Sequence, residues 1–263
     1  MKYEAIKFDR RGAVAWITLY RPQVLNALSP NLIDELGRAI ALAEDDPAIR
    51  VLVITGSPPA FCAGADLKFI GSGIGESLGD GLASFLELLG SVFNALERSM
   101  LPTIAAVNGL ALAGGLELVL CCDLVIAADS ATLGDAHANY GLIPGGGSSI
   151  RLPRKIGPTR AKYLLYTGES LAASDLIDCG LVNRVVPDNA LRSTVQEIAE
   201  TIAAKSPLAI RRVKQLVNDA IDQPLLSALR QEINVGIVHT QSQDMREGLA
   251  AFKEKRKPKF VGR

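Results

Sequence analysis

The sequence predicts an α/β fold in which parallel strands alternate with helices. Two observations support this prediction. Short apolar runs rich in β-branched residues occur at 51–55, 103–107 and 124–128, and segments with helical periodicity separate them. Continuous apolar runs are typical of strands buried on both faces, and alternation with helices is typical of parallel units. A chain of 263 residues can bury one large core and carry an added helical segment.

The first half of the chain carries clear signals for individual elements. Two β-prone runs, 3–8 and 13–19, predict an N-terminal hairpin. Ser29 stands before Pro30, which favours a helix with Ser29 as its N-cap and proline at its first position. A further helix is predicted over 82–96, and the glycine-rich stretch 71–81 before it is expected to be a loop or a ragged helix start.

The β signal ends after about residue 187, and only helices are predicted beyond it. We therefore divide the chain into an α/β core, residues 1–190, and a C-terminal helical segment of the same unit, residues 191–263. Such a segment has to pack on the core or on another subunit. The predicted helices cover 190–204, 207–220, 225–238 and 244–253.

Charge and cysteine content exclude several classes of function. The 28 basic residues balance the 28 acidic ones, so no net field favours nucleic acid or an anionic membrane surface. The N-terminus lacks the pattern of a signal peptide, and no apolar run is long enough to span a membrane. We expect a soluble, cytoplasmic protein with no nucleic-acid partner, no membrane partner and no metal site. The cysteines lack metal or disulfide spacing and are expected to be reduced thiols: Cys62, Cys121, Cys122 and Cys179.

The first candidate site is the stretch of small residues 61–67, just beyond a predicted buried strand. In open α/β sheets, ligands bind at the carboxyl ends of strands. Ala63, Gly64 and Ala65 leave main-chain amides accessible to a ligand, and Asp66 suits the N-cap of a following helix. The same residues also suit an ordinary tight turn.

The second candidate site is the stretch 108–118, where a glycine pair opens a predicted helix. Unpaired N–H groups at a helix N-terminus carry partial positive charge, so the amide of Gly114 can stabilise an oxygen that becomes negative. Glu117 lies about one turn further on and is either a solvated first-turn residue or a buried acid/base group. Two amides from separate turns are what an oxyanion hole requires.

Other site types are disfavoured. The glycines at 71–75 do not follow a strand with dinucleotide-binding spacing, and no phosphate-binding GxxxxGK[ST] motif is present. A hydrolase triad of Ser148, His137 and Asp135 lacks the GxSxG elbow, and Asp135 and His137 are expected to alternate on a short extended segment.

Several segments, spread over nearly the whole chain, resemble the enoyl-CoA hydratase/isomerase (crotonase) superfamily. The resemblance implies a crotonase-like spiral of ββα units with a C-terminal helical trimerisation segment, and a homotrimer or a dimer of trimers. It also implies an acyl-CoA thioester substrate, with coenzyme A as part of that substrate and no permanently bound cofactor. The matching segments are RPQVLNALS, FCAGADLK, NGLALAGGLELVLCCDLVIAAD, ASDLIDCGLVNRVVP and EGLAAFKEKRKPKF.

The resemblance also implies roles for particular residues. Carried over by position, the amides of Ala65 and Gly114 hold the thioester oxygen and stabilise an enolate, and Glu117 is the first catalytic glutamate. Phe252 and Lys255 belong to a helix that can reach a neighbouring subunit's ligand. The implied coenzyme A contacts are Val24, Ala27, Ala63, Asp66, Leu67, Phe252 and Lys255.

The sequence departs from the family pattern at the second catalytic position, where His137 replaces the expected glutamate. An imidazole can take or give a proton near neutral pH, so Glu117 and His137 can still form a working pair. Alternatively, His137 only orients its loop, hydrogen-bonded to Asp135. Gly145 stands about where dienoyl-CoA isomerases and aromatic dehalogenases of the family carry a carboxylate, which disfavours both subfamilies.

The main functional hypothesis is hydratase-type addition or elimination of water on a 2-enoyl-CoA, with Ala65, Gly114, Glu117 and His137 as the catalytic groups. The first alternative is isomerisation, decarboxylation or carbon–carbon cleavage of an acyl-CoA thioester, which passes through the same enolate. The second is a non-catalytic acyl-CoA binding or assembly subunit, suggested by the substitution at position 137.

Overall fold

A computed structural model describes residues 3–68 and 78–263 and contains two sheets. The larger sheet confirms the three predicted buried strands and the predicted hairpin, but the first strand of the hairpin covers 6–11 instead of 3–8. Its strands lie in the order β1-β2-β3-β5-β7-β10, with β1 antiparallel to β2 and the other neighbours parallel. The strands are β1 (Ile6–Arg11), β2 (Val14–Leu19), β3 (Val51–Gly56), β5 (Thr103–Val107), β7 (Leu124–Ala128) and β10 (Arg184–Val186).

The smaller sheet has the order β4-β6-β8-β9 and creates the spiral of ββα units that the family resemblance implies. Strands β3, β5 and β7 each pass directly into a strand of this second sheet before the next helix begins. None of its strands is predicted from the sequence, because three residues are too few to show an alternating pattern. They are β4 (Ala60–Cys62), β6 (Leu110–Leu112), β8 (Thr132–Gly134) and β9 (Ser170–Ala172).

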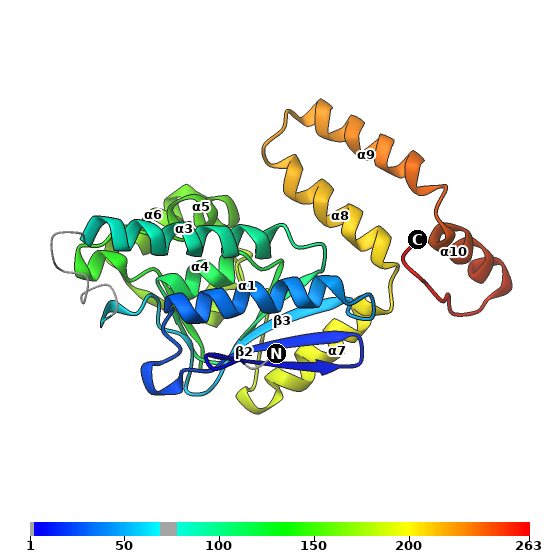
Figure 1. Ribbon diagram of the computed structural model, residues 1–263. Coiled ribbons are helices and arrows are strands. Elements are labelled where there is room, and N and C mark those ends of the chain that lie inside the picture. The colour runs from blue at the N-terminus through cyan, green and yellow to red at the C-terminus, as the bar shows by residue number, and fades with distance from the viewer. Residues whose placement is uncertain (1–2, 69–77) are drawn as a thin grey trace.

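Helices cover the larger sheet on both faces (Figure 1). Helix α1 (Pro30–Asp45) packs against α3 (Leu78–Glu97) on one face, and α7 (Leu191–Ala203) packs on β2, β3, β5 and β7 from the other. The predicted N-cap of α1 is confirmed, because Ser29 Oγ accepts the N–H of Leu32 at 3.3 Å. Of the stretch 71–81, predicted as a loop or a ragged helix start, residues 71–77 lie outside the described part of the chain and 78–81 belong to α3.

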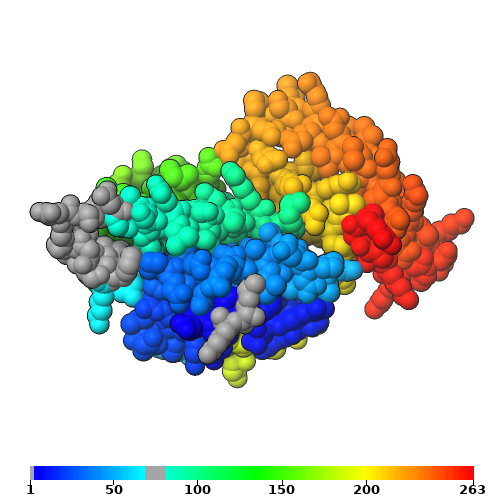
Figure 2. Space-filling model, in the orientation of Figure 1, coloured from blue at the N-terminus to red at the C-terminus, as the bar shows by residue number. Residues whose placement is uncertain are grey.

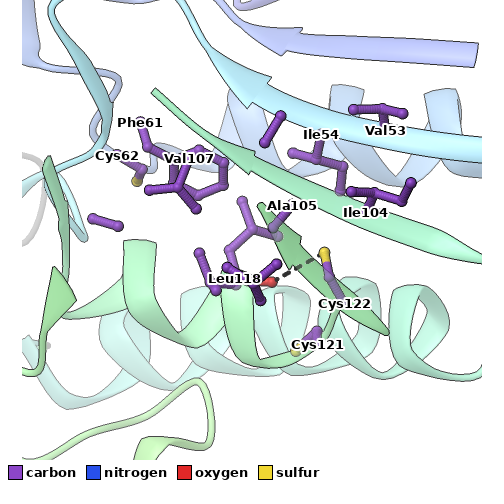
Figure 3. Close-up of a cluster of buried hydrophobic side chains, with 14 of the residues drawn as sticks. Val53, Ile54, Phe61, Cys62, Ile104, Ala105, Val107, Leu118, Cys121 and Cys122 are labelled. Carbon is purple, nitrogen blue, oxygen red and sulfur yellow. Dashed lines mark hydrogen bonds between the residues drawn. The ribbon is translucent and has the colours of Figure 1, made fainter. Parts of the chain in front are cut away.

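Helix α4 (Gly114–Leu120) is entirely buried and packs against β4 and β6. Figure 3 shows Leu118 and Cys122 beside apolar side chains of β3 and β5, including Ile54 and Ala105. Glycine is required at position 115, since a Cβ atom there would collide with the main-chain oxygen of Cys62. The glycine pair therefore lets the start of α4 approach the end of β4. The free thiols of the structure are Cys62, Cys121, Cys122 and Cys179.

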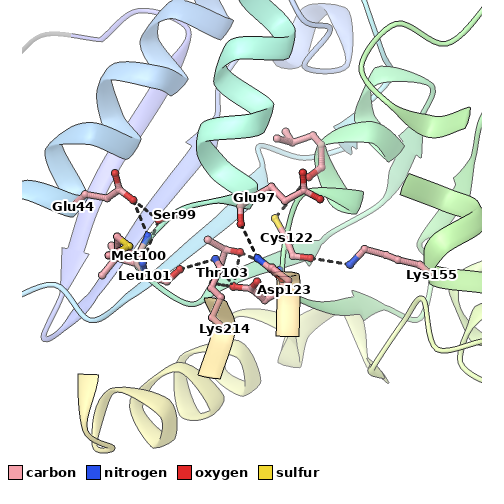
Figure 4. Close-up of polar contacts among 12 residues, drawn as sticks. Glu44, Glu97, Ser99, Met100, Leu101, Thr103, Cys122, Asp123, Lys155 and Lys214 are labelled. Atoms are coloured by element: carbon pink, nitrogen blue, oxygen red, sulfur yellow. Dashed lines mark hydrogen bonds and ion pairs between the residues drawn. The ribbon is translucent and has the colours of Figure 1, made fainter. Parts of the chain in front are cut away.

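The last helices extend away from this body as an arm (Figures 1 and 2). They match the predicted helices to within about two residues, and neither α8 nor α9 contains a buried residue. Lys214 anchors the arm, because its Nζ lies 2.8 Å from Asp123 Oδ2 and donates to the Leu101 oxygen at 2.9 Å (Figure 4). The arm comprises α8 (Pro207–Ala220), α9 (Leu225–His239) and α10 (Gln243–Glu254).

The remaining elements of the core are two helices and four short 3-10 turns within the described residues. Helices α5 (Ser148–Ile156) and α6 (Pro158–Thr167) pack against each other, and α5 also packs against α4. The short 3-10 turns are η1 (Pro22–Val24), η2 (His137–Tyr140), η3 (Ala173–Leu176) and η4 (Asp188–Ala190). No helix within the described ranges is long and apolar enough to cross a membrane.

Candidate active site

The turn after β2 and the segment after β4 are joined by main-chain hydrogen bonds. The N–H of Leu28 donates to the Gly64 oxygen at 2.8 Å, and the N–H of Asp66 donates to the Leu28 oxygen at 2.9 Å. In a planar trans peptide the C=O and the N–H point in opposite directions. Because the Gly64 carbonyl faces Leu28, the N–H of Ala65 in the same peptide faces away from it, toward the other side of the segment.

A buried asparagine that the sequence did not single out holds this turn in place. Asn26 adopts a left-handed conformation (φ 57°), which asparagine tolerates better than most residues. Its Nδ2 donates to the oxygens of Ser57 and Ala60, both at 2.8 Å, and its Oδ1 accepts the Arg21 N–H at 2.9 Å. Arg21 in turn forms an ion pair with Asp66 at 2.9 Å. The shape of the segment that carries Ala65 thus depends on side chains from both segments.

The residues expected to contact coenzyme A fall into two groups. The first group lies in or beside these two bonded segments, and Leu67 at its edge is 47% exposed. The second group, Phe252 in α10 and Lys255 at its C-cap, lies on the arm, far from α4 in the same chain (Figure 1). Phe252 is 86% exposed. The first group consists of Val24, Ala27, Ala63, Asp66 and Leu67.

The amide of Gly114 lies next to the amide of Ala65. Gly114 is the first residue of α4, where backbone N–H groups have no partner within the helix. The preceding residue, Ala113, has φ 49° and ψ −116°, a strained conformation that sets the direction of this amide. A Cβ atom on Gly114 would lie 3.4 Å from the Ala65 nitrogen and 2.9 Å from Leu28 Cδ1. The absence of a side chain at 114 therefore leaves a small space beside both amides.

Glu117 is a buried acid, and its interpretation as a solvated first-turn residue is wrong. Its exposed fraction is 1%, and its Oε1 accepts the N–H groups of Gly146 at 2.8 Å and Ser148 at 3.0 Å. Burial raises the pKa of Glu117, while the Ser148 amide, the His137 charge and the Gly146 amide oppose the rise. A Cβ atom on Gly146 would lie 2.5 Å from Glu117 Oε2, so glycine there makes room for the carboxylate. Neither amide donor was predicted from the sequence, although three glycines before a helix are a signal for such a terminus.

His137 lies close enough to Glu117 for each charge to shift the pKa of the other. Its Nδ1 is 2.9 Å from Asp135 Oδ1, and its side chain is 12% exposed. Burial by itself lowers the pKa of His137, but the hydrogen bond and charge of Asp135 and the charge of Glu117 outweigh it, and the net pKa is raised. The extended segment predicted here is wrong, because Ala136 is left-handed (φ 59°) and η2 begins at His137.

The remaining alternatives for this site are not supported by its geometry. The Oγ of Ser148 is buried and has no hydrogen-bond partner among the described residues, so no serine–histidine pair is formed. Gly145 supplies no carboxylate, and a Cβ atom there would lie 2.5 Å from Leu86 Cδ2. Within residues 3–68 and 78–263, no group of three or more His, Cys, Asp or Glu side chains is arranged to hold a metal ion.

Comparisons with known proteins show the family and the fold of the chain. The family model for enoyl-CoA hydratase/isomerase matches residues 9–263. A crotonyl-CoA hydratase of Syntrophomonas wolfei is 38% identical, and a probable enoyl-CoA hydratase of Mycobacterium bovis is 40% identical, each over the full length of both chains. The crystal structure of an enoyl-CoA hydratase from Bacillus anthracis superposes with a TM-score of 0.94 at 38% identity, covering 99% of this chain and 100% of the other. The chain has the crotonase fold and belongs to the enoyl-CoA hydratase/isomerase family.

Proposed function

We propose that this protein is a hydro-lyase that adds water across the double bond of a 2-enoyl-CoA thioester. The observation that carries the proposal is the buried carboxylate of Glu117, held one helical turn beyond the paired amides of Ala65 and Gly114. Full-length relatives named crotonyl-CoA hydratase and enoyl-CoA hydratase support the same reaction. Coenzyme A enters as part of the substrate, and no permanently bound cofactor takes part.

In the proposed mechanism the two amides bind the oxygen of the thioester. Their N–H groups withdraw electron density through the conjugated system and make carbon 3 electrophilic. When the oxygen of water bonds to carbon 3, the electron pair of the double bond moves toward the thioester and produces an enolate oxygen. The N–H groups of Ala65 and Gly114 already lie side by side before the reaction, so they stabilise that negative charge without reorganisation, which is usually the largest contribution to catalysis in such sites.

The two proton transfers are assigned to Glu117 and His137. Glu117, as a carboxylate, accepts a proton from the attacking water, and His137, as an imidazolium, donates a proton to carbon 2 of the enolate. Glu117 then passes its proton, through solvent, to His137, so the product is the 3-hydroxyacyl-CoA and the enzyme is unchanged. The raised pKa of His137 supports this assignment, because it keeps the ring protonated to higher pH than an ordinary histidine.

This assignment predicts a bell-shaped dependence of kcat/KM on pH. Activity needs Glu117 ionised and His137 protonated, so the acid limb should lie above the ordinary glutamate pKa of 4.5 and the basic limb above the ordinary histidine pKa of 6.5. His137→Ala should remove the basic limb and lower kcat by roughly 10²- to 10⁴-fold. The control is His239→Ala, on α9 beside Arg212, which should leave the profile unchanged.

The reaction itself is tested by mass spectrometry of a panel of 2-enoyl-CoA thioesters, starting with crotonyl-CoA. The expected product gains the mass of one water while the enoyl absorbance disappears. If no chain length gains water at high enzyme concentration, the protein is not a hydratase. The same panel covers the alternatives: an isomer shift without mass change indicates an isomerase, loss of carbon dioxide a decarboxylase, and a shortened acyl chain a carbon–carbon lyase. Binding without turnover would indicate an acyl-CoA binding subunit.

We also propose that the arm packs against other copies of this chain to form a homotrimer or a dimer of trimers. Phe252 and Lys255 then reach a neighbour's coenzyme A, while the turn with Val24 and Ala27 and the segment with Ala63, Asp66 and Leu67 hold coenzyme A in their own subunit. Apolar side chains on α8 and α9 that are unprotected in one chain support this assembly. Light scattering should give three or six times the subunit mass, and a monomer would contradict it. The exposed apolar side chains of the two helices are Val213, Val217, Leu225, Leu226, Leu229, Ile233 and Ile237, and Ile221 at the C-cap of α8 adds to them.

A further inference from the structure

We infer that Asp135 is a positioning residue, which holds His137 in the tautomer protonated at Nδ1 so that Nε2 faces the substrate. The inference rests on the proposed function, in which His137 donates the proton to carbon 2. Asp135 does not contact the substrate and acts only through the imidazole ring. The effect of Asp135 on the tautomer and the pKa of His137 can therefore be measured with no substrate present.

One oxygen of Asp135 makes both contacts with His137. Oδ1 lies 2.9 Å from Nδ1 of the ring and accepts the backbone N–H of the same residue at 3.3 Å. An ionised carboxylate only accepts hydrogen bonds, so the ring nitrogen that faces it has to carry a proton. The neutral ring is then protonated at Nδ1, and Nε2 is the nitrogen that gains and loses the catalytic proton. Left-handed Ala136 folds the chain between the two side chains.

The turn alone does not explain why a charged residue occupies position 135. Asp135 is 1% exposed, and its Oδ2 is buried without a hydrogen-bond partner among the described residues. Burying a carboxylate oxygen without a partner costs free energy. A neutral asparagine offers the same single acceptor oxygen to the N–H of His137 and would build the turn without burying a charge. The charge has a purpose only if a positive charge forms beside it, and the imidazolium of His137 supplies one.

Two carboxylates from different elements act on the ring of His137. Asp135 follows β8, and Glu117 belongs to α4; these are the charged groups that act on His137 within the described residues. Their environments separate their roles. Glu117 Oε1 is held by two backbone amides, and its Oε2 accepts no hydrogen bond from the described part of the chain, which leaves it for the water proton. Asp135 is directed at the ring and stabilises its charged form.

Nuclear magnetic resonance of the ring nitrogens tests the inference directly. The chain has two histidines, so each can be assigned in one pair of single-residue variants. In the wild-type protein the neutral form of His137 should carry its proton on Nδ1, and its pKa should lie above the ordinary 6.5. A wild-type ring protonated mainly on Nε2 would overturn the inference without any variant at position 135. His239, which contacts Arg212 on the arm, serves as an internal reference.

Asp135→Asn separates the charge from the turn, because the Oδ1 acceptor for the His137 N–H is kept. The pKa of His137 should fall, the basic limb of the pH profile should move to lower pH, and kcat should drop about 10- to 100-fold with little change in KM. The matched control is Asp34→Asn, an exposed carboxylate on α1 paired with Arg38, which should change none of these.

The outcomes distinguish the inference from the proposed function. An unchanged His137 pKa and tautomer in Asp135→Asn overturns the inference, whatever the activity. A shifted pKa with an unmoved pH profile, in a protein that hydrates crotonyl-CoA, also overturns it, because His137 then does not depend on Asp135 for catalysis. If the wild-type protein hydrates no enoyl-CoA, the proposed function fails, and the resonance data alone decide whether Asp135 holds the ring.

Discussion

Glu117→Gln is expected to lower kcat by roughly 10²- to 10⁴-fold and to raise the melting temperature at pH 7. The side-chain amide of glutamine cannot accept a proton from water, so no general base assists the attack of water on carbon 3. The shape of the site should survive, because the remaining carbonyl oxygen can still accept the N–H groups of Gly146 and Ser148. Opposite effects on activity and stability are typical of a charge kept in a buried site for catalysis.

The stability effect depends on pH with a sign set by the raised pKa of Glu117, whose main cause is burial. A carboxyl whose pKa is raised on folding contributes stability below its unfolded pKa, and that contribution is lost as pH rises through the folded pKa. Glutamine does not ionise, so its advantage over glutamate should be largest at pH 7 and should vanish near pH 4. Thermal melts across this range measure it. A melting temperature lower than that of the wild-type protein at pH 7 would contradict the assignment of Glu117 as a buried base whose charge destabilises the fold.

A matched control is available in Glu35, a second buried carboxylate on a helix. It is 3% exposed and accepts the N–H groups of Glu4, Ala5 and Ile6, just before and at the start of β1, far along the chain from Glu117 and His137. Glu35→Gln weakens charge-assisted hydrogen bonds, so it should lower the melting temperature and leave kcat of the folded enzyme near wild type. The pair Glu117→Gln and Glu35→Gln therefore separates a functional charge from a structural one.

Gly114→Ala is expected to lower kcat/KM by roughly 10²- to 10³-fold while the protein still folds. The new methyl group would lie 3.4 Å from the Ala65 nitrogen and occupy the space where the thioester oxygen meets the two amides. Its closest contact, at 2.9 Å, is Leu28 Cδ1, the end of a flexible side chain that can move. Steady-state kinetics with crotonyl-CoA, together with a circular-dichroism melt, measure both effects.

The neighbouring glycine provides the contrast. In Gly115→Ala the methyl group would collide with the main-chain oxygen of Cys62 in β4, which cannot move without displacing the strand. That variant should lose stability, with activity falling only as the folded fraction falls. If Gly114→Ala behaved in the same way as Gly115→Ala, or kept full activity, the space beside the Gly114 and Ala65 amides would not be the oxyanion hole.

Much of the larger sheet, most of the helices and the positions of the key site residues followed from the sequence. Buried parallel strands are continuous apolar runs, and a helix start is marked by local residues, as Ser29 and Pro30 mark α1. A glycine pair after a strand made the amide of Gly114 a candidate donor, with Glu117 one turn later, and the family resemblance added the roles of both. These features depend on neighbours within a few residues, which is why they can be read from the sequence without a structure.

Only the tertiary structure decided the second sheet and the chemical state of the site. Strands β4, β6 and β8 exist because each pairs with a segment distant in sequence, and three residues carry no pattern of their own. Glu117 is buried and held by amides that begin 29 residues further along the chain, and His137 gains its charge environment from Asp135 and Glu117 together. Burial and pKa depend on everything packed around a group. Glu117 and His137 could therefore be named as candidates from the sequence and the family resemblance, whereas their burial and their partners required the fold.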